Sequence, residues 1–304
     1  MRHGAAAQRA PQGIALAIAA VACLAALDTS TKYVAPVVPL VVALWCRFVF
    51  QASVTAAAML PTRGRALLRT RRPGLQLLRG VLMVSCSACA FVSFRIMPVG
   101  DVTAIAMLAP IAITVLAMFG FGERLSTARL ACVAGGFIGA LVVVRPGGSM
   151  LGWALLAPFG MLATNTAFQL VTSRLAMIDD PATTHFYTGC IGLALTTLLV
   201  PFFWTSGLAP STWGLLLLLG VLGTVGHFLL ILAYQRAPAT TVMPFLYTQI
   251  AFAVLGGWLV FAHVPDAASW LGIALIAVSG ATGTWLAARE KRAAVALAVL
   301  PLPP

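Results

Sequence analysis

The chain has 304 residues, of which 61% are hydrophobic and only 9% are charged. Soluble globular proteins carry about a quarter of their residues as Asp, Glu, Lys and Arg, and so little charge cannot cover this much apolar side chain in water. The composition therefore excludes an ordinary soluble fold and predicts a membrane protein. The chain has 19 basic and 7 acidic residues, but its densest basic run, at residues 63–72, lies between two apolar stretches without interleaved aromatic residues, so we expect no nucleic acid as a partner.

Runs of about 20 apolar residues, the length that crosses a hydrocarbon core, recur along the whole sequence. In chain order they predict membrane-spanning helices at residues 13–35, 39–60, 75–97, 99–121, 126–144, 151–175, 182–204, 212–236, 240–262 and 268–288. None of these runs alternates polar and apolar residues as a barrel strand does. The sequence therefore predicts an all-α integral membrane protein of about ten transmembrane helices.

The basic residues are distributed unevenly between the segments that connect these helices. If the N-terminus is cytoplasmic, one set of connections holds most of the 19 Lys and Arg residues, including a cluster at residues 63–72. The opposite set holds only Lys32, Arg95 and Arg145. Cytoplasmic loops are enriched in Lys and Arg, so we expect a multi-pass protein of the cytoplasmic (inner) membrane with both termini in the cytoplasm. Anionic membrane lipid is the expected partner of the arginine cluster.

The sequence also repeats itself at a shift of about 140 residues. The aligned residues are Gly80-Val81-Leu82 with Gly220-Val221-Leu222, and Phe94, Pro98 and Val102 with Tyr234, Pro238 and Val242. Each half holds five predicted helices, an odd number, so the second half must cross the membrane in the opposite sense. We therefore predict a cytoplasmic N-terminal tail (1–12), a first repeat (13–146), a second, inverted repeat (151–289) and a cytoplasmic C-terminal tail (290–304).

The order and duplication of several motifs resemble the EamA type of the drug/metabolite transporter superfamily. The matching segments are 95–104 with Pro110, 122–125, 135–139 with 145–146, 223–227, 233–238, 244–248 and 264–266. Residues 28–32 followed by 45–48 resemble the branch that contains S-adenosylmethionine and riboflavin carriers. The resemblance implies a permease whose central cavity is lined chiefly by the first, third, fourth, sixth, eighth and ninth helices. The family often has an acidic residue at the position of His263, so we expect no role for a carboxylate at this position of the second repeat.

The resemblance implies a secondary active transporter that moves a small metabolite by alternating access, driven by an ion or proton gradient or by exchange. An intramembrane enzyme and a passive channel are the alternatives. The sequence has no P-loop, no zinc-protease or nucleophile-elbow motif, and no ring of like charges that would mark a selective pore. We expect no enzymatic activity, no cofactor and no metal. The expected partner is a small-molecule metabolite, and the chain is expected to be a monomer or a homodimer.

Three charged residues are predicted to lie deep in the membrane. Asp28 and Lys32 lie one turn apart on the first helix, and Arg47 lies at a similar depth on the second. An ionised side chain at such depth costs at least about 2.5 kcal/mol unless it is paired. The three residues either form a structural ion pair or triad, or bind substrate or protons. Both interpretations require that Asp28 faces the interior of the bundle.

The remaining candidates for substrate or ion binding are uncharged. Asn165 and Gln169 on the sixth helix, and Gln249 on the ninth, could donate hydrogen bonds to a substrate, although buried amides also join helices. His227 on the eighth helix suits proton coupling because histidine titrates near neutral pH, but a packing role is equally compatible with its position. Tyr247 is predicted to line the cavity, since it follows a proline that frees a backbone carbonyl.

Overall fold

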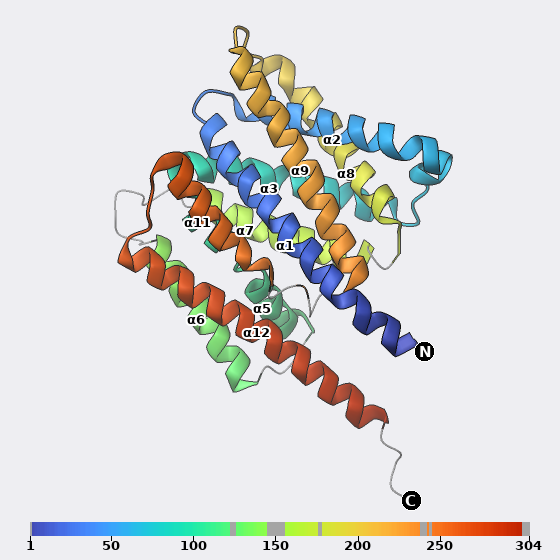
Figure 1. Cartoon of the computed structure of the whole chain (residues 1–304), viewed down its shortest axis with the longest axis vertical. Coiled ribbons are helices and arrows are strands. Elements are labelled where there is room, and N and C mark those ends of the chain that lie inside the picture. The colour runs from blue at the N-terminus through green and yellow to red at the C-terminus, as the bar shows by residue number, and fades with distance from the viewer. Residues whose placement is uncertain are drawn as a thin grey trace, which may run out of the picture.

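The computed structural model of the chain describes residues 2–121, 126–144, 156–175, 178–237, 242 and 245–299, and they contain helices but no strand. In chain order the helices are α1 (Arg2–Val34), α2 (Leu40–Arg63), the 3-10 helix η1 (Gly64–Leu68), α3 (Pro73–Ile96), α4 (Val99–Ala106), α5 (Ala109–Phe121), α6 (Thr127–Val144), α7 (Leu156–Leu175), α8 (Pro181–Phe203), α9 (Pro210–Arg236), α11 (Thr248–Phe261) and α12 (Ala267–Val299). They form one elongated bundle (Figure 1). Six of the described helices, α1, α2, α3, α8, α9 and α12, are long and apolar enough to cross a membrane. The prediction of an all-α integral membrane protein is confirmed.

Local sequence signals set many of the helix ends. The helices α3, α8 and α9 begin with proline, whose missing N–H costs nothing in the first turn. The carboxylate of Asp180 caps α8 by accepting a hydrogen bond of 2.8 Å from the amide of Ala182. Two helices exceed their predicted ends, since α1 begins at Arg2 and α12 continues to Val299. Alanine, the strongest helix former, is abundant in both extensions.

Two predicted spans are interrupted at equivalent positions of the two halves. A turn at Met107 and Leu108 divides the span 99–121 into α4 and α5. In the span 240–262, Tyr247 forms a turn immediately before α11, about 140 residues further along the chain. Paired interruptions of this kind in inverted repeats surround substrate sites in other carriers, because the interrupted backbone exposes polar groups inside the membrane.

The helix packing is preserved when the two halves are exchanged. The helix α1 packs along α9, and its counterpart in the second half, α7, packs along α3. In the same way α2 packs against α9, and α8 packs against α3. Two glycines repeat this relation in detail, because Gly80 faces Ile191 and Gly220 faces Phe50. Each of these helices thus packs against a partner equivalent to that of its counterpart in the other half. This symmetry is expected of a duplicated, inverted pair of repeats.

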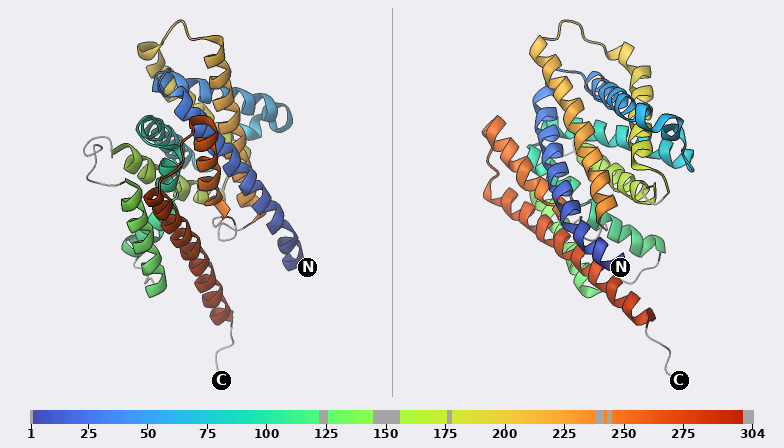
Figure 2. Two further views of the ribbon diagram at one scale, coloured as in Figure 1. Left: turned by 60° about the vertical axis from the view of Figure 1, so that its left-hand side comes forward. Right: turned by 45° about the vertical axis from the view of Figure 1, so that its right-hand side comes forward.

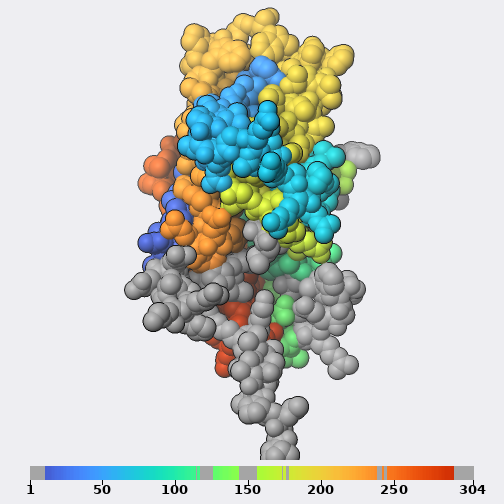
Figure 3. Space-filling model, turned by 90° about the vertical axis from the view of Figure 1, so that its right-hand side faces the viewer, coloured from blue at the N-terminus to red at the C-terminus, as the bar shows by residue number. Residues whose placement is uncertain are grey.

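The described parts of the connections that were predicted to share one face of the membrane lie at one end of the bundle. Three side-chain pairs join them, namely Arg63–Asp180, Arg129–Glu290 and Arg236–Gln12. We call this end, which contains residues 63–72, the arginine-rich end. It lies to the right and lower right in Figure 1, and Figure 3 views it with the light-blue surface of α2 and η1 near the yellow surface of α8. The turn between α1 and α2 lies at the opposite end, so the helices run alternately between the two ends.

The helices α6 and α12, which occupy matching positions in the two halves, pack closely through glycine. A Cβ atom on Gly139 would lie 2.8 Å from the carbonyl oxygen of Gly272, and one on Gly272 would lie 2.7 Å from that of Gly139. Gly135 makes a similar approach to Ser279. The two helices lie side by side at the edge of the bundle (Figure 2). The small residues therefore serve close helix packing here.

Candidate functional site

A cavity of about 290 Å³ lies between the two halves, near the lower limit for pockets that hold small molecules. Its lining comes from α1, α3, α4, α7 and α9, with Ile113 of α5 and with Leu246 and Gln249 of the ninth span. These elements belong to the six helices that the family resemblance implies. The helix α2 is an addition, because Arg47 reaches into the cavity from it.

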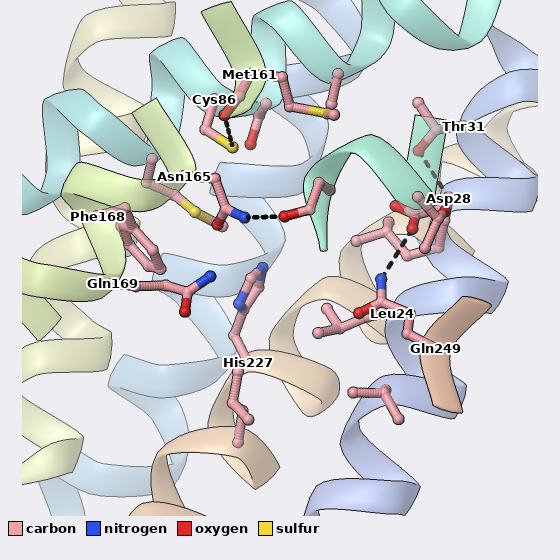
Figure 4. A pocket seen from close by; sticks show the side chains of 18 of the residues that line it. Leu24, Asp28, Thr31, Cys86, Met161, Asn165, Phe168, Gln169, His227 and Gln249 are labelled. Atoms are coloured by element: carbon pink, nitrogen blue, oxygen red, sulfur yellow. Dashed lines mark hydrogen bonds between the residues drawn. The ribbon is translucent and has the colours of Figure 1, made fainter. Parts of the chain in front are cut away.

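One wall of the cavity carries a carboxylate. Asp28 of α1 accepts a hydrogen bond of 3.0 Å from Nε2 of Gln249 (Figure 4). Gln249 lies in the first turn of α11, directly after the interruption at Tyr247. The positive end of the helix dipole at this terminus favours a nearby anion. Because Asp28 lines the cavity, it faces the interior of the bundle, as both interpretations of the sequence require.

Arg47 is held on another wall by two neutral partners. Its Nη1 donates to the hydroxyl of Ser87 at 3.1 Å, and its Nη2 lies 3.0 Å from Nε2 of His227. Because arginine can only donate, Nε2 of His227 accepts, and the ring is the neutral tautomer with its proton on Nδ1. Gly223 of α9 makes room for the guanidinium, since a Cβ there would lie 2.7 Å from Nε of Arg47. Arg47 thus couples α2 to α3 and α9.

Arg79 of α3 is a second buried arginine in the cavity lining, and it was not among the site residues predicted from the sequence. Its Nε donates to the hydroxyl of Thr172 at 2.8 Å, and its Nη1 donates to the carbonyl of Thr184 and the hydroxyl of Thr188. The guanidinium lies 4.5 Å from the ring centroid of Phe168, a cation–π contact. These contacts fix Arg79 between α7 and α8.

The predicted ion pair or triad of Asp28, Lys32 and Arg47 is absent from the described residues, because no two of them lie within salt-bridge distance. Lys32 instead donates to the carbonyl oxygens of Phe94 and Met97 at 2.9 and 2.7 Å. Its long side chain reaches towards the opposite end of the bundle, as lysine does near a membrane surface. Lys32 lies outside the cavity lining and ties α1 to the end of α3.

The uncharged candidates divide into cavity residues and a packing residue. Asn165 and Gln169 both line the cavity, with Nδ2 of Asn165 donating to the carbonyl of Ala106 at 3.4 Å. The Oε1 atom of Gln169 is buried with no hydrogen-bond partner among the described residues. Tyr247 is not part of the lining, because its phenol packs against Gly280 of α12, where the missing side chain leaves room.

Most of the apolar and hydroxyl lining was not identified from the sequence. The missed residues include Leu24, Thr31, Cys86, Phe91, Phe94, Thr103, Met161, Phe168 and Tyr234. They lie on helices that are apolar on every face, so no periodic pattern marks the side that faces the cavity. The motif residues Glu123, Arg124, Pro238 and Pro244 lie outside the described residues.

Two aspartates that precede α8 bind the end of α2 and the segment that leads into α3, at the arginine-rich end. Asp180 forms a salt bridge with Arg63. Asp179 accepts hydrogen bonds from the amide of Arg71 at 3.0 Å, from Nε2 of Gln76 at 2.9 Å and from the hydroxyl of Thr70. Burial raises the pKa of Asp179, but these hydrogen bonds outweigh it and lower the pKa below its ordinary value. The carboxylate is therefore ionised at neutral pH.

The sequence matches the EamA-like transporter family over residues 11–145 and 148–282. It is similar to a riboflavin transporter of Rhizobium johnstonii, at 34% identity over 70% of each chain. A pseudopaline exporter of Pseudomonas aeruginosa is 31% identical over 71% of this chain and 76% of its own length. An S-adenosylmethionine uptake transporter of Rickettsia conorii is 27% identical over 76% of this chain and 78% of its own. A crystal structure of a protein with 22% identity has the same fold, with a TM-score of 0.64 over 91% of this chain and 99% of that one.

Proposed function

The chain belongs to the EamA-like transporter family, and from this premise we propose that it is a secondary active carrier that works by alternating access. It is a membrane transporter of small metabolites and not an enzyme. The observation that carries the proposal is the position of the cavity, which lies between two inverted halves and receives polar side chains from both. A site at such an interface can open to either side when the two halves exchange their arrangements.

We propose that the arginine-rich end faces the cytoplasm, with both chain termini on that side of the inner membrane. The support is the excess of arginine in residues 63–72 and in the other connections at this end. The cavity would then open alternately past the contacts of Asp179 with residues 70–76 on the inner side and past the Lys32 contacts on the outer side. A gradient of protons or other ions, or exchange for a second solute, would drive net movement.

We propose that Asp28 binds the substrate or a proton within this cavity. Replacing Asp28 by Asn keeps the shape and the Gln249 contact but removes the charge, so transport should be lost while the protein still inserts into the membrane. Asp266→Asn makes the same exchange at the opposite end, outside the cavity lining, and should leave transport unchanged. Uptake and efflux by vesicles with equal amounts of each variant provide the measurement. Normal transport by Asp28→Asn would rule out the role.

His227 is proposed to link protonation to the position of Arg47. In the present arrangement its Nε2 accepts from Arg47, so protonation at this nitrogen requires the contact to break. The variant His227→Gln should therefore shift the pH profile of transport, whereas His263→Gln, at an exposed histidine near the opposite end, should not. An unshifted profile in His227→Gln would leave this residue with a packing role alone.

Counterflow in proteoliposomes separates the carrier from the other two functions. Riboflavin and S-adenosylmethionine are the first solutes to test, because relatives are named for them. A carrier accelerates uptake of labelled solute when unlabelled solute is present inside. A channel shows uptake without this stimulation, and an enzyme converts the solute into a product.

A further inference from the structure

Two guanidinium groups line the cavity without an acidic partner. The side chains belong to Arg47 and Arg79, which are 8% and 2% exposed. Neither lies within salt-bridge distance of a carboxylate in the described part of the chain. All their hydrogen-bond partners are neutral. They are three hydroxyl groups, one backbone carbonyl and one imidazole.

Burying a cation among neutral partners costs several kcal/mol, and arginine cannot avoid this cost by losing its proton. Each guanidinium has five N–H groups, and the protein occupies only part of them. The Nε atom of Arg47 is buried with no partner among the described residues. Asp28 attracts Arg47 electrostatically, but the two side chains lie beyond salt-bridge distance. The carboxylate of Asp28 is hydrogen-bonded to Gln249 instead. The described lining therefore has more positive than negative charge.

The two arginines belong to one connected part of the wall. Arg79 lies over the ring of Phe168. This ring contacts that of His227 edge-on, with 6.4 Å between the ring centroids, and His227 is hydrogen-bonded to Arg47. In Figure 4 Phe168, Gln169 and His227 lie on one side of the cavity, and Asp28 and Gln249 lie on the other. The polar groups are thus separated into a cationic wall and an acidic wall, with apolar side chains around both.

We propose that Arg47 and Arg79 bind the anionic group, a carboxylate or phosphate, of an amphipathic substrate whose apolar body occupies the rest of the cavity. The planar fork of arginine matches these anions better than any other side chain. The apolar part of the substrate would contact Leu24, Phe91, Phe94 and Met161. Asp28, on the facing wall, would accept a hydrogen bond from an ammonium or hydroxyl group of the same molecule. This substrate class rests on the proposed carrier function.

The test compares acids with neutral counterparts that have the same skeleton. Purified protein in nanodiscs of neutral lipid is heated with indole-3-acetate or indole-3-acetamide, with phenylpropionate or phenylpropionamide, and with flavin mononucleotide or riboflavin. We expect at least one acid to raise the Tm more than its neutral partner. Its Kd should weaken by about tenfold or more in Arg47→Gln and in Arg79→Gln, as expected for the loss of a charge-assisted hydrogen bond.

Matched variants separate recognition from folding and from surface charge. Arg65→Gln makes the same exchange on η1, outside the cavity lining, and should keep the full preference for the acid. If Arg79→Gln does not fold, Arg79→Lys retains the charge without the fork and should bind the acid more weakly than the unmodified chain. Sodium chloride alone, which should give no arginine-dependent shift, tests for a simple inorganic anion site.

Four results overturn the proposal: no acid outperforms its neutral partner, the preference survives in both cavity variants, Arg65→Gln also abolishes it, or chloride alone reproduces it. The carrier function is judged separately by counterflow. Stimulated exchange of neutral riboflavin without any preference for acids would overturn the anion site and leave the carrier intact. Arginine-dependent acid binding without exchange would support the anion site and overturn the carrier function.

Discussion

The contact between Gly223 and Arg47 offers a sharp test of the cavity geometry. In Gly223→Ala the new methyl group would lie 2.7 Å from Nε, 3.4 Å from Cζ and 3.5 Å from Cδ of Arg47. The guanidinium must then move by about 0.7 Å to restore an ordinary contact. Its hydrogen bond to His227, now 3.0 Å long, would exceed a useful length if the movement is away from that ring.

The expected cost follows from opposing contributions. Overpacking a buried site costs about 1–3 kcal/mol, and weakening a hydrogen bond from a charged group adds about 1 kcal/mol. Alanine in place of glycine within a helix raises the free energy of unfolding by about 1 kcal/mol, because alanine has the higher helix propensity. We therefore expect Gly223→Ala to lower the free energy of unfolding by about 1–3 kcal/mol and to reduce transport, since the displaced group lines the cavity.

Thermal unfolding in detergent and transport by vesicles measure the two effects. Gly214→Ala is the matched control on α9, because a Cβ at that position has no neighbour within 4 Å. Arg47→Ala removes the crowded atoms, so adding Gly223→Ala to it should cost nothing further. A Gly223→Ala variant as harmless as the control, or an effect that is unchanged in the Arg47→Ala background, would contradict this contact between Gly223 and Arg47.

Three further predictions concern the surroundings of the cavity. The lowered pKa of Asp179 means that its stabilising effect is present above the ordinary value of 3.8 and is lost only as the pH falls below it; the Tm difference between the unmodified chain and Asp179→Asn should be constant from about pH 5 to 8 and shrink in stronger acid. Gly280→Ala should lower the Tm because the new methyl group would overlap the hydroxyl and two ring carbons of Tyr247, and it should cost nothing further in a Tyr247→Ala background, which lacks that ring. Gly139→Ala should lower the Tm because the methyl meets backbone of α12, whereas Gly257→Ala, with no neighbour within 4 Å, should not.

The membrane class, the helical spans and the duplication could be predicted from the sequence because each depends on local composition or on internal similarity. Asp28 was also predictable as an inward-facing residue, since an ionised group is too costly against lipid. The interruption at Met107 was not predicted. It lies within an apolar run in which Pro110, the second residue of α5, favours a kink or a helix start but does not by itself separate one kinked helix from two short ones.

The partners within the site could not be predicted because they come from distant parts of the chain. Arg47 meets His227 across 180 residues, and Asp28 meets Gln249 across 221. Lys32 was expected beside Asp28 from its spacing, but the length of its side chain lets it reach carbonyl groups at the end of α3 instead. Depth in the membrane thus identifies residues that need partners, and tertiary packing decides which partners they find.

Access to the cavity from each side of the membrane distinguishes alternating access from a cavity with one fixed opening. In a cysteine-free chain, Ala90→Cys places a thiol in the cavity lining, and Leu198→Cys places one on a side chain that is 70% exposed on the apolar surface. A small, charged thiol reagent is added from one side at a time to vesicles of known orientation. We expect the thiol at position 90 to react from both sides and the thiol at position 198 to react from neither. Reaction at position 90 from one side only, or from none, would contradict a cavity that opens alternately to the two faces of the membrane.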